Sequence, residues 1–357
     1  MNMIKNVMKT RRDSVICFAI VIVAYIAMQI MIATGSISHS LSGMLIPICA
    51  YIVMAISLNL TVGILGELSL GHAGFMSVGA FTGIVVTTVL ADSVSAPMLR
   101  LFIAMIFAAI AAAIVGVIVG VPVLRLKGDY LAIVTLAFGE IIKNIINVLY
   151  IGLDSNGLHF SIVKQSFTLA EGGKMIINGP IGVSGINKIS TFTAGFILIL
   201  VTLFIVLNLI NSRQGRAIMA VRDNKIAADS IGISTTRYKL MAFVISAAFA
   251  GMAGTLYAMN YSTITAAKFD FNLSILVLVF VVLGGLGNIW GSIIAAALLT
   301  LLPEILRALN FNDYRMLVYA ILLIALMLFN NSGLKQRILE RRAMKKTEAM
   351  DKKRGVA

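Results

Sequence analysis

Residues 211–240 read NSRQGRAIMAVRDNKIAADSIGISTTRYKL, a polar and basic stretch between two long apolar runs. It carries six basic residues and only two acidic ones, Asp223 and Asp229. Its alanines, isoleucines and valines recur at a mixed helical spacing, and Gly232 follows them as a helix stop. The stretch therefore predicts a short charged helix between two membrane spans, at a position where a partner protein can bind it.

The composition around this stretch indicates a membrane protein. Of the 357 residues, 59% are hydrophobic and 12% are charged, whereas a soluble domain has about 45–50% and about 25%. The apolar residues gather in runs of about 20, the length that crosses a bilayer as a helix. We therefore expect an all-α, polytopic inner-membrane protein.

The apolar runs predict about 10 transmembrane helices, within a range of 8–10. The expected spans are 15–34, 41–60, 74–90, 99–121, 130–150, 191–210, 239–262, 273–286, 292–309 and 314–329. The count would change if 63–75 were re-entrant. The corresponding division is an N-terminal tail 1–14, a permease domain 15–330 and a basic tail 331–357.

The distribution of positive charge gives the expected orientation. Basic residues cluster before Ser14, in the loop of Arg125 and Lys127, in 211–240 and after Gly333. With ten spans, all four clusters fall on one side, as the positive-inside rule requires of the cytoplasmic face. We expect both termini in the cytoplasm and 211–240 beside them. The basic residues lack interleaved aromatics, which argues against nucleic acid as a partner.

Residues 151–190 form the longest non-apolar segment. Its few charges are balanced, and it is punctuated by turn pairs such as Asn156-Gly157 and Gly172-Gly173. We expect an outer loop that could meet a protein delivering substrate.

Two glycine-interrupted stretches, 63–83 and 284–291, lie in the two halves of the chain. Paired broken segments are a pointer to a transport site near the midplane, because unwound backbone exposes groups that bind a polar solute. The alternative is that the glycines only allow close helix packing. The candidate path residues here are Gly63, Gly66, Ser69, Gly71, His72, Gly284, Gly285 and Gly287.

Glu140 lies near the middle of an expected span, and Lys143 follows at i+3 on the same face. Ionisable residues inside spans are functional suspects, so both join the candidate path. The alternative is a structural ion pair between packed helices. His72, close to Glu67, is either structural or part of a proton relay.

Motifs for catalysis are missing from the sequence. It has no GxxxxGK[ST] phosphate loop, no HExxH, no GxSxG and no Cys/His cluster with metal-ligand spacing. We expect no enzyme, no metal site and no cofactor bound by this chain, so ATP-driven transport would need ATP used by partner subunits.

Several segments resemble one transporter family. They are YIVMAISLNLTVGILGELSLGHAGFMSVGAF (51–81), LRLKGDYLAIVTLAFGEII (124–142), NGPIGVSGI (178–186), SRQGRAIMAVRDNKIAADSIGISTTRYKLMAFVISAAFAGMAGTLYA (212–258) and LVFVVLGGLGNIWGSIIAAALL (278–299). In order and number they resemble the signatures of LivM-type permease subunits of ABC importers for branched-chain amino acids. One departure is Asn187, where the family usually has proline.

The resemblance implies a second, LivH-like permease subunit, two cytoplasmic ATPase subunits and an extracytoplasmic solute-binding protein as partners. It also implies that 211–240 docks on the ATPase, with Arg216, Ala227, Ala228 and Gly232 as coupling residues. Ile226 stands where importers of this type carry glutamate.

The motifs leave the solute open between leucine, isoleucine or valine, other amino acids, and small solutes such as urea or short amides. An ion-coupled secondary transporter, using Glu140, Lys143 and His72 as a relay, is a further alternative. A non-transporting membrane scaffold is disfavoured by the broken segments and the intramembrane charges.

Overall fold

The computed structural model describes residues 21–34 and 39–308, apart from Ala24, Ala33, Asp92, Lys127, Asn156 and 165–172, together with Ala320, Ile321, Ile324 and Leu328. The chain divides into two units, Met1–Leu298 and Leu299–Ala357. The description below concerns the first unit, to which the candidate sites belong. The predicted tails 1–14 and 331–357 and nearly all of the span 314–329 lie outside the described residues.

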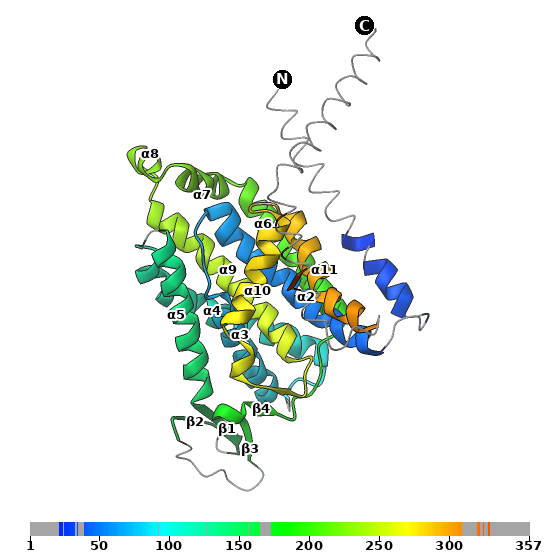
Figure 1. The fold of residues 1–357 in the computed structure, drawn as a ribbon. Coiled ribbons are helices and arrows are strands. Elements are labelled where there is room, and N and C mark those ends of the chain that lie inside the picture. The colour runs from blue at the N-terminus through cyan, green and yellow to red at the C-terminus, as the bar shows by residue number, and fades with distance from the viewer. Residues whose placement is uncertain are drawn as a thin grey trace, which may run out of the picture. The chain divides into compact units, whose positions relative to one another are not determined.

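Helices, most of them long, make up most of the described chain (Figure 1). They are α2 (His39–Asn59), continued by the π-helix η1 (Leu60–Leu65), α3 (His72–Val89), α4 (Pro97–Val123), α5 (Asp129–Asn147), α6 (Phe192–Asn211), α7 (Arg213–Asp223), α8 (Lys225–Ser230), α9 (Thr235–Ala258), α10 (Phe271–Gly284) and α11 (Ile289–Ala308). A helical segment over Val21–Ile32 precedes them; its Tyr25 ring stacks on Phe196 of α6 at 4.1 Å between centroids.

Seven helices in the described part of the chain are long and apolar enough to cross a membrane: Leu41–Leu65, His72–Val89, Pro97–Val123, Phe192–Asn211, Thr235–Ala258, Ala266–Gly284 and Ile289–Leu306. This confirms a polytopic membrane protein. The predicted span 130–150 does form a helix, α5, but it is not among the seven.

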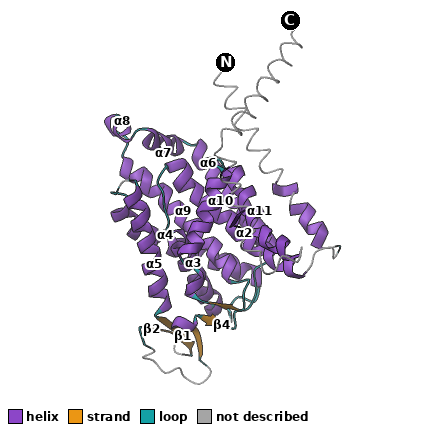
Figure 2. Ribbon diagram, viewed as in Figure 1, coloured by secondary structure: helices purple, strands orange, loops and turns teal. Residues whose placement is uncertain are grey.

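The expectation of an all-α chain is wrong at 151–190, where the structure forms strands (Figure 2). β1 (Leu149–Asp154) pairs antiparallel with both β2 (Gly157–Ile162) and β3 (Lys174–Asn178). The 3-10 turn η2 (Gly179–Ile181) leads to β4 (Val183–Ser184), which pairs with β5 (Thr263–Ile264), and η3 (Ala266–Lys268) follows. Asp154 and Gly157 face each other at the end of this hairpin, so Gly157 of the Asn-Gly pair is the first residue of β2, with a φ of 118°.

Small residues let α3 and α9 approach closely. A Cβ added at Gly79 would lie 2.0 Å from the carbonyl oxygen of Gly251, and one added at Gly254 would lie 2.0 Å from the carbonyl oxygen of Met76. Glycine is required at both positions, because any larger residue would clash with the backbone of the facing helix. Such close contact matters in lipid, where the hydrophobic effect does not drive helices together and association depends on packing. The glycines of α9 thus have the packing role predicted for this span.

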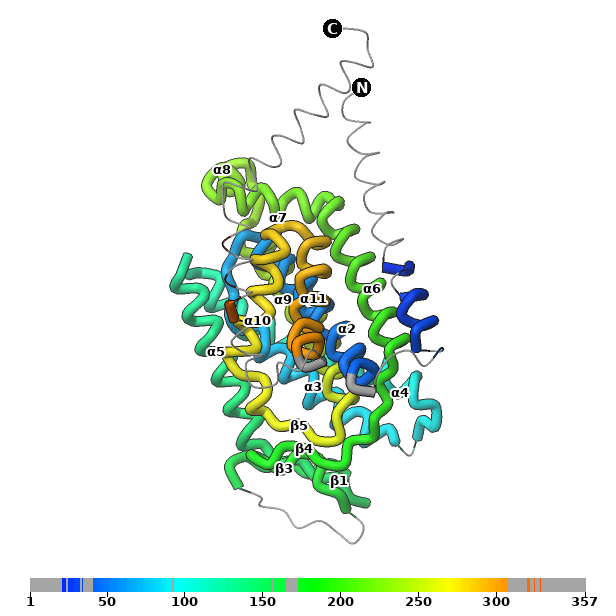
Figure 3. The backbone as a smooth tube through the Cα atoms, turned by 45° about the vertical axis from the view of Figure 1, so that its right-hand side comes forward, coloured from blue at the N-terminus to red at the C-terminus, as the bar shows by residue number. Residues whose placement is uncertain are grey.

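The short helices and the strands lie at the two ends of the helix bundle of the first unit. The helices α7 and α8 cover one end, and the strands β1, β2 and β3 lie at the other (Figures 1 and 3). The predicted loops 211–240 and 151–190 therefore lie at opposite ends.

Candidate functional site

The first glycine-rich stretch is a break between two helices. α2 ends in the π-turn Leu60–Leu65, and Gly66 stops it with a φ of 80° in the left-handed region. Residues 67–71 have no regular structure, and α3 begins at His72. A π-turn followed by unwound backbone is a feature found at functional sites.

The second stretch is a break of the same kind. α10 ends at Gly284 and α11 begins at Ile289, with Gly285 and Gly287 both at positive φ, 95° and 80°. A Cβ on Gly291 would lie 1.7 Å from the carbonyl oxygen of Gly284, so the two helix ends can approach only through glycine.

The two breaks meet, although 228 residues separate their linked positions Asn59 and Gly287. Asn59 Oδ1 accepts from Gly287 N at 2.9 Å, and Asn59 Nδ2 donates to Ser292 Oγ at 2.8 Å. A Cβ on Gly63 would lie 2.2 Å from Gly287 N. The structure thus brings together the two halves that the glycine pattern predicted as a pair, with the fully buried Asn59 as the link.

The unwound connector 67–71 is anchored by an ion pair. The carboxylate of Glu67 binds the ammonium of Lys239 at the start of α9, and the two side chains are only 14% and 9% exposed. Breaking such a buried pair leaves an uncompensated charge and is costly, so the pair fixes the connector against α9.

The far end of the connector is anchored on α5 and α10. Leu70 N donates to Thr135 Oγ1 at 3.0 Å, and Ala73 N donates to Ser274 Oγ at 3.1 Å. A Cβ on Gly71 would lie 2.3 Å from the carbonyl oxygen of Thr135. Close packing is therefore one reason for Gly71, which supports the alternative given for the glycines at this position.

Three hydroxyls around the break have no hydrogen-bond partner within the described chain: Thr61 Oγ1, Ser69 Oγ and Ser77 Oγ. All three are buried. Buried polar atoms without a partner cost free energy, so these hydroxyls are candidate contacts for a polar solute or water at the break.

His72 lies at the start of α3 and is 2% exposed. A 2.8 Å hydrogen bond joins its Nε2 to Ser57 Oγ, and the Ser57 hydroxyl donates to Met54 O at 2.9 Å. Because one hydroxyl proton serves one acceptor, Nε2 is the donor and the imidazole has a structural partner.

Glu140 and Lys143 form the expected i,i+3 ion pair on α5. Glu140 Oε1 also accepts from Phe271 N at 3.1 Å, the first residue of α10, where the helix dipole favours negative charge. The pair thus joins two packed helices, as the structural alternative predicts. The polar partner of His72 is Ser57, so hydrogen bonds do not connect the three residues of the suggested relay within the described chain.

The stretch 211–240 forms two helices where one was predicted. Ser212 caps α7 by accepting from Gly215 N at 3.1 Å, and Asn224 caps α8 by accepting from Ala227 N at 3.0 Å. Asn224 has extended backbone (φ −154°, ψ 103°), so the helix breaks there and restarts. Gly232 follows α8 at φ 83°, as the predicted helix stop.

The predicted coupling residues lie on or beside α7 and α8. Arg216 is exposed and donates to Asn211 O at 3.1 Å, Ala227 and Gly232 are exposed, and Ala228 is buried. Ile226 and Ile231 are 82% and 75% exposed. These two exposed apolar side chains are candidate contacts for a partner protein.

Arg222 joins α7 directly to the first break. Its Nη1 donates to the carbonyl oxygen of Gly63 at 3.1 Å, and a Cβ on Gly66 would lie 2.5 Å from Arg222 Cγ. In the sequence Arg222 is one basic residue among six, and neither it nor Asn59 was a predicted site residue. An amide inside an apolar run, as in SLNL, is the signal that could have identified Asn59.

Comparison with known proteins identifies the family. The family model described as "Branched-chain amino acid transport system / permease component" matches residues 40–327. The chain is 34% identical to the high-affinity branched-chain amino acid transport system permease protein LivM of Salmonella typhimurium, over 91% of this chain and 75% of the relative. It is 29% identical to BraD of Pseudomonas aeruginosa, over 80% of this chain and 91% of the relative.

A shorter region resembles a second permease of the same kind. The chain is 32% identical to LivH of Escherichia coli over 123 residues, which are 34% of this chain and 40% of the relative. No solved structure matches the chain. The length of the family match and the identity to LivM establish that this protein belongs to the branched-chain amino acid transport system permease family.

Proposed function

We propose that this chain is the transmembrane permease subunit of an ATP-driven importer that carries leucine, isoleucine or valine into the cytoplasm. The contact of Arg222 with Gly63 carries the proposal, because it links the exposed helices α7 and α8 to the broken helix at the crossing. The printed names of the relatives, LivM and BraD, supply the substrate class. Members of the family are permease components of a membrane transport system and not enzymes.

The proposed assembly contains a LivH-like second permease subunit, two cytoplasmic ATPase subunits that use ATP, and an extracytoplasmic solute-binding protein. The resemblance to both LivM and LivH supports the two-permease arrangement. In this proposal α7 and α8 face the cytoplasm with both termini, the strands β1–β3 face outward toward the binding protein, and the spans number about ten.

The proposed mechanism is mechanical. The exposed side chains of Ile226 and Ile231 contact the ATPase and dock α8 on it. At Ile226 an apolar contact thus replaces the contact of the glutamate that such loops usually carry. Closure of the ATPase moves α7 and α8 together, and Arg222 transmits the movement to the backbone at Gly63. The link from Asn59 to Gly287 then opens or closes the crossing of the two breaks.

Uptake tests the transport assignment. A strain lacking this gene should lose ATP-dependent uptake of radiolabelled leucine, isoleucine and valine, and the gene on a plasmid should restore it. Unchanged uptake of all three in the deletion strain would remove the amino-acid assignment. Restoration of urea or short-amide uptake would assign the alternative solutes.

Arg222→Ala tests the coupling. We expect substrate uptake to fall at least about tenfold while membrane insertion and assembly with the ATPase persist. The change removes the hydrogen bond to Gly63 and the packing on Gly66, together with the exposed ion pair of Arg222 with Asp223. The control is Arg213→Ala, on the same helix and likewise exposed, whose side chain makes no hydrogen bond within the described chain. Equal uptake in the two variants would contradict a role of Arg222 in coupling.

A further inference from the structure

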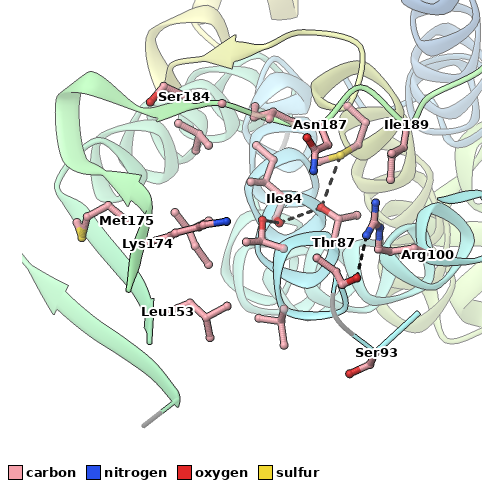
Figure 4. A pocket seen from close by; sticks show the side chains of 18 of the residues that line it. Ile84, Thr87, Ser93, Arg100, Leu153, Lys174, Met175, Ser184, Asn187 and Ile189 are labelled. Carbon is pink, nitrogen blue, oxygen red and sulfur yellow. Dashed lines mark hydrogen bonds between the residues drawn. The ribbon is translucent and has the colours of Figure 1, made fainter. Parts of the chain in front are cut away.

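A cavity of about 620 Å³ (Figure 4) opens at the strand end of the bundle, and α7 and α8 lie at the opposite end (Figure 1). β1, β3 and β4 line one side, and α3 and the start of α4 line the other. Its volume falls within the range of about 300–1,000 Å³ that small-molecule sites occupy. The cavity thus has the size of a site for a small solute.

Arg100, in the first turn of α4, is the exceptional residue of this cavity. It is only 9% exposed, and its Nε has no hydrogen-bond partner among the described residues. Among the described residues, its guanidinium donates only to the carbonyl oxygen of Ala91, at 3.5 Å, the limit of a hydrogen bond. No carboxylate of the described chain lies within ion-pair distance of it.

A buried guanidinium without an anion is expensive. Arginine also presents a planar fork that matches a carboxylate, and charge-assisted bonds of this kind are about twice as strong as neutral ones. Figure 4 shows Arg100 at the edge of the cavity beside Asn187 and Thr87. An anion that enters the cavity would supply the partner that Arg100 lacks among the described residues.

The rest of the lining fits the other parts of an aliphatic amino acid. Aliphatic side chains on both sides of the cavity provide apolar surface; they include Ile84, Leu153, Ile176, Ile186, Ile189 and Met259. Asp154 is also among the lining residues; its side chain is 2% exposed and its Oδ2 lies 3.0 Å from His159 Nε2. A carboxylate there can accept a bond from an ammonium group.

We propose that this cavity is an entry site for the zwitterion of an aliphatic amino acid, whose carboxylate binds the guanidinium of Arg100. The ammonium group of the solute lies toward Asp154, and its side chain contacts the aliphatic lining. This inference rests on the proposed function, since it gives the imported solute a first site before the crossing of the two breaks.

Binding to the full chain in lipid nanodiscs tests the proposal without any partner protein. Radiolabelled leucine should bind and be displaced by 4-methylpentanoate, which keeps the carboxylate, far better than by leucinamide, which lacks it. Arg100→Gln should weaken leucine binding by about ten- to a hundredfold, the value of a charge-assisted hydrogen bond. Arg100→Lys should retain an intermediate affinity.

Arg125→Gln is the matched control, since Arg125 is exposed beyond the other end of the same helix. Each variant must remain monodisperse and melt like the wild type, and Arg100→Lys replaces Arg100→Gln if the latter does not fold. If the wild-type chain fails to bind leucine, if leucinamide displaces it as well as 4-methylpentanoate does, or if Arg100→Gln and Arg125→Gln bind alike, the proposal is overturned.

Measurements on the whole importer separate the entry site from a contact with a partner protein and from the proposed function. If Arg100→Gln weakens only the association with the solute-binding protein, the anion is a carboxylate of that partner and the entry site is overturned. If the importer carries leucine while leucine binding is independent of Arg100, the entry site fails and the proposed function stands. Absence of branched-chain uptake by the wild-type importer would instead remove the proposed function.

Discussion

Replacing Gly63 with alanine puts a single methyl group into the crossing of the two breaks. The added Cβ would lie 1.9 Å from Asn59 Oδ1, 2.2 Å from Gly287 N and 2.8 Å from Gly287 Cα. Two of these atoms are backbone, and the third is an amide oxygen already bonded to Gly287 N. None can give way as the end of a flexible side chain would, so the two helix breaks must separate.

The expected change in the free energy of unfolding of Gly63→Ala combines two destabilising contributions and one stabilising contribution. Overpacking of this kind costs about 1–3 kcal/mol, and loss of the hydrogen bond between Asn59 and Gly287 costs about 0.5–1.5 kcal/mol. Replacing a helical glycine by alanine returns up to about 1 kcal/mol. The net destabilisation of the transporter is therefore about 0.5–4.5 kcal/mol, and it is concentrated at the proposed path.

The assay combines thermal unfolding of the purified importer in detergent with leucine uptake in membrane vesicles. Gly63→Ala should lower the unfolding temperature and reduce uptake more strongly than expression. Gly43→Ala is the control on the same helix, because a Cβ there meets nothing within 4 Å, and it should be neutral or slightly stabilising. Equal stability and uptake in the two variants would refute the contact between the breaks.

Three further perturbations address the ion pairs and the helix stop. Glu67→Gln leaves the buried Lys239 unpaired and should destabilise the protein by about 3–5 kcal/mol; the double variant with Lys239→Met should recover much of this loss, and a strictly additive thermal-unfolding cycle would contradict the pairing. Glu140→Gln should lower protein accumulation while Glu140→Gln with Lys143→Met restores it, and normal accumulation with lost transport would favour the path role. Gly232→Pro should abolish uptake with insertion intact, because proline cannot adopt a φ of 83°; normal uptake would contradict the coupling role of this loop.

The sequence predicted the two broken segments but not how they meet. Glycine density marks where a helix can unwind, so 63–83 and 284–291 could be found by inspection. The hydrogen bonds of Asn59 join positions more than two hundred residues apart, and a single sequence does not determine such pairings. The salt bridge of Glu67 with Lys239 was missed for the same reason.

Local signals account for the other differences between expectation and structure. The helix breaks at Asn224 because its side chain caps α8, which competes with one continuous helix. The apolar spacing of 211–240 does not reveal this break, because α7 and α8 bury the same kind of residue. The segment 151–190 was expected to be a turn-rich loop, although Asn156-Gly157 also predicts a hairpin. The predicted i,i+3 pair of Glu140 with Lys143 needed only helical geometry and is confirmed.

In the proposed coupling, the contacts between the two breaks connect α7 to the proposed path. Arg222 donates to the carbonyl oxygen of Gly63, and Gly63 packs on Gly287, to which Asn59 is bonded. Each of the two hydrogen bonds contributes about 0.5–1.5 kcal/mol net, weak enough to exchange during the proposed transport cycle. The packing between them is backbone against backbone, which cannot deform gradually and so favours two discrete arrangements. In this proposal, a shift of α7 that releases the carbonyl oxygen of Gly63 therefore moves the first break away from the second in one step. The ion pair of Glu67 with Lys239 keeps the connector 67–71 fixed on α9.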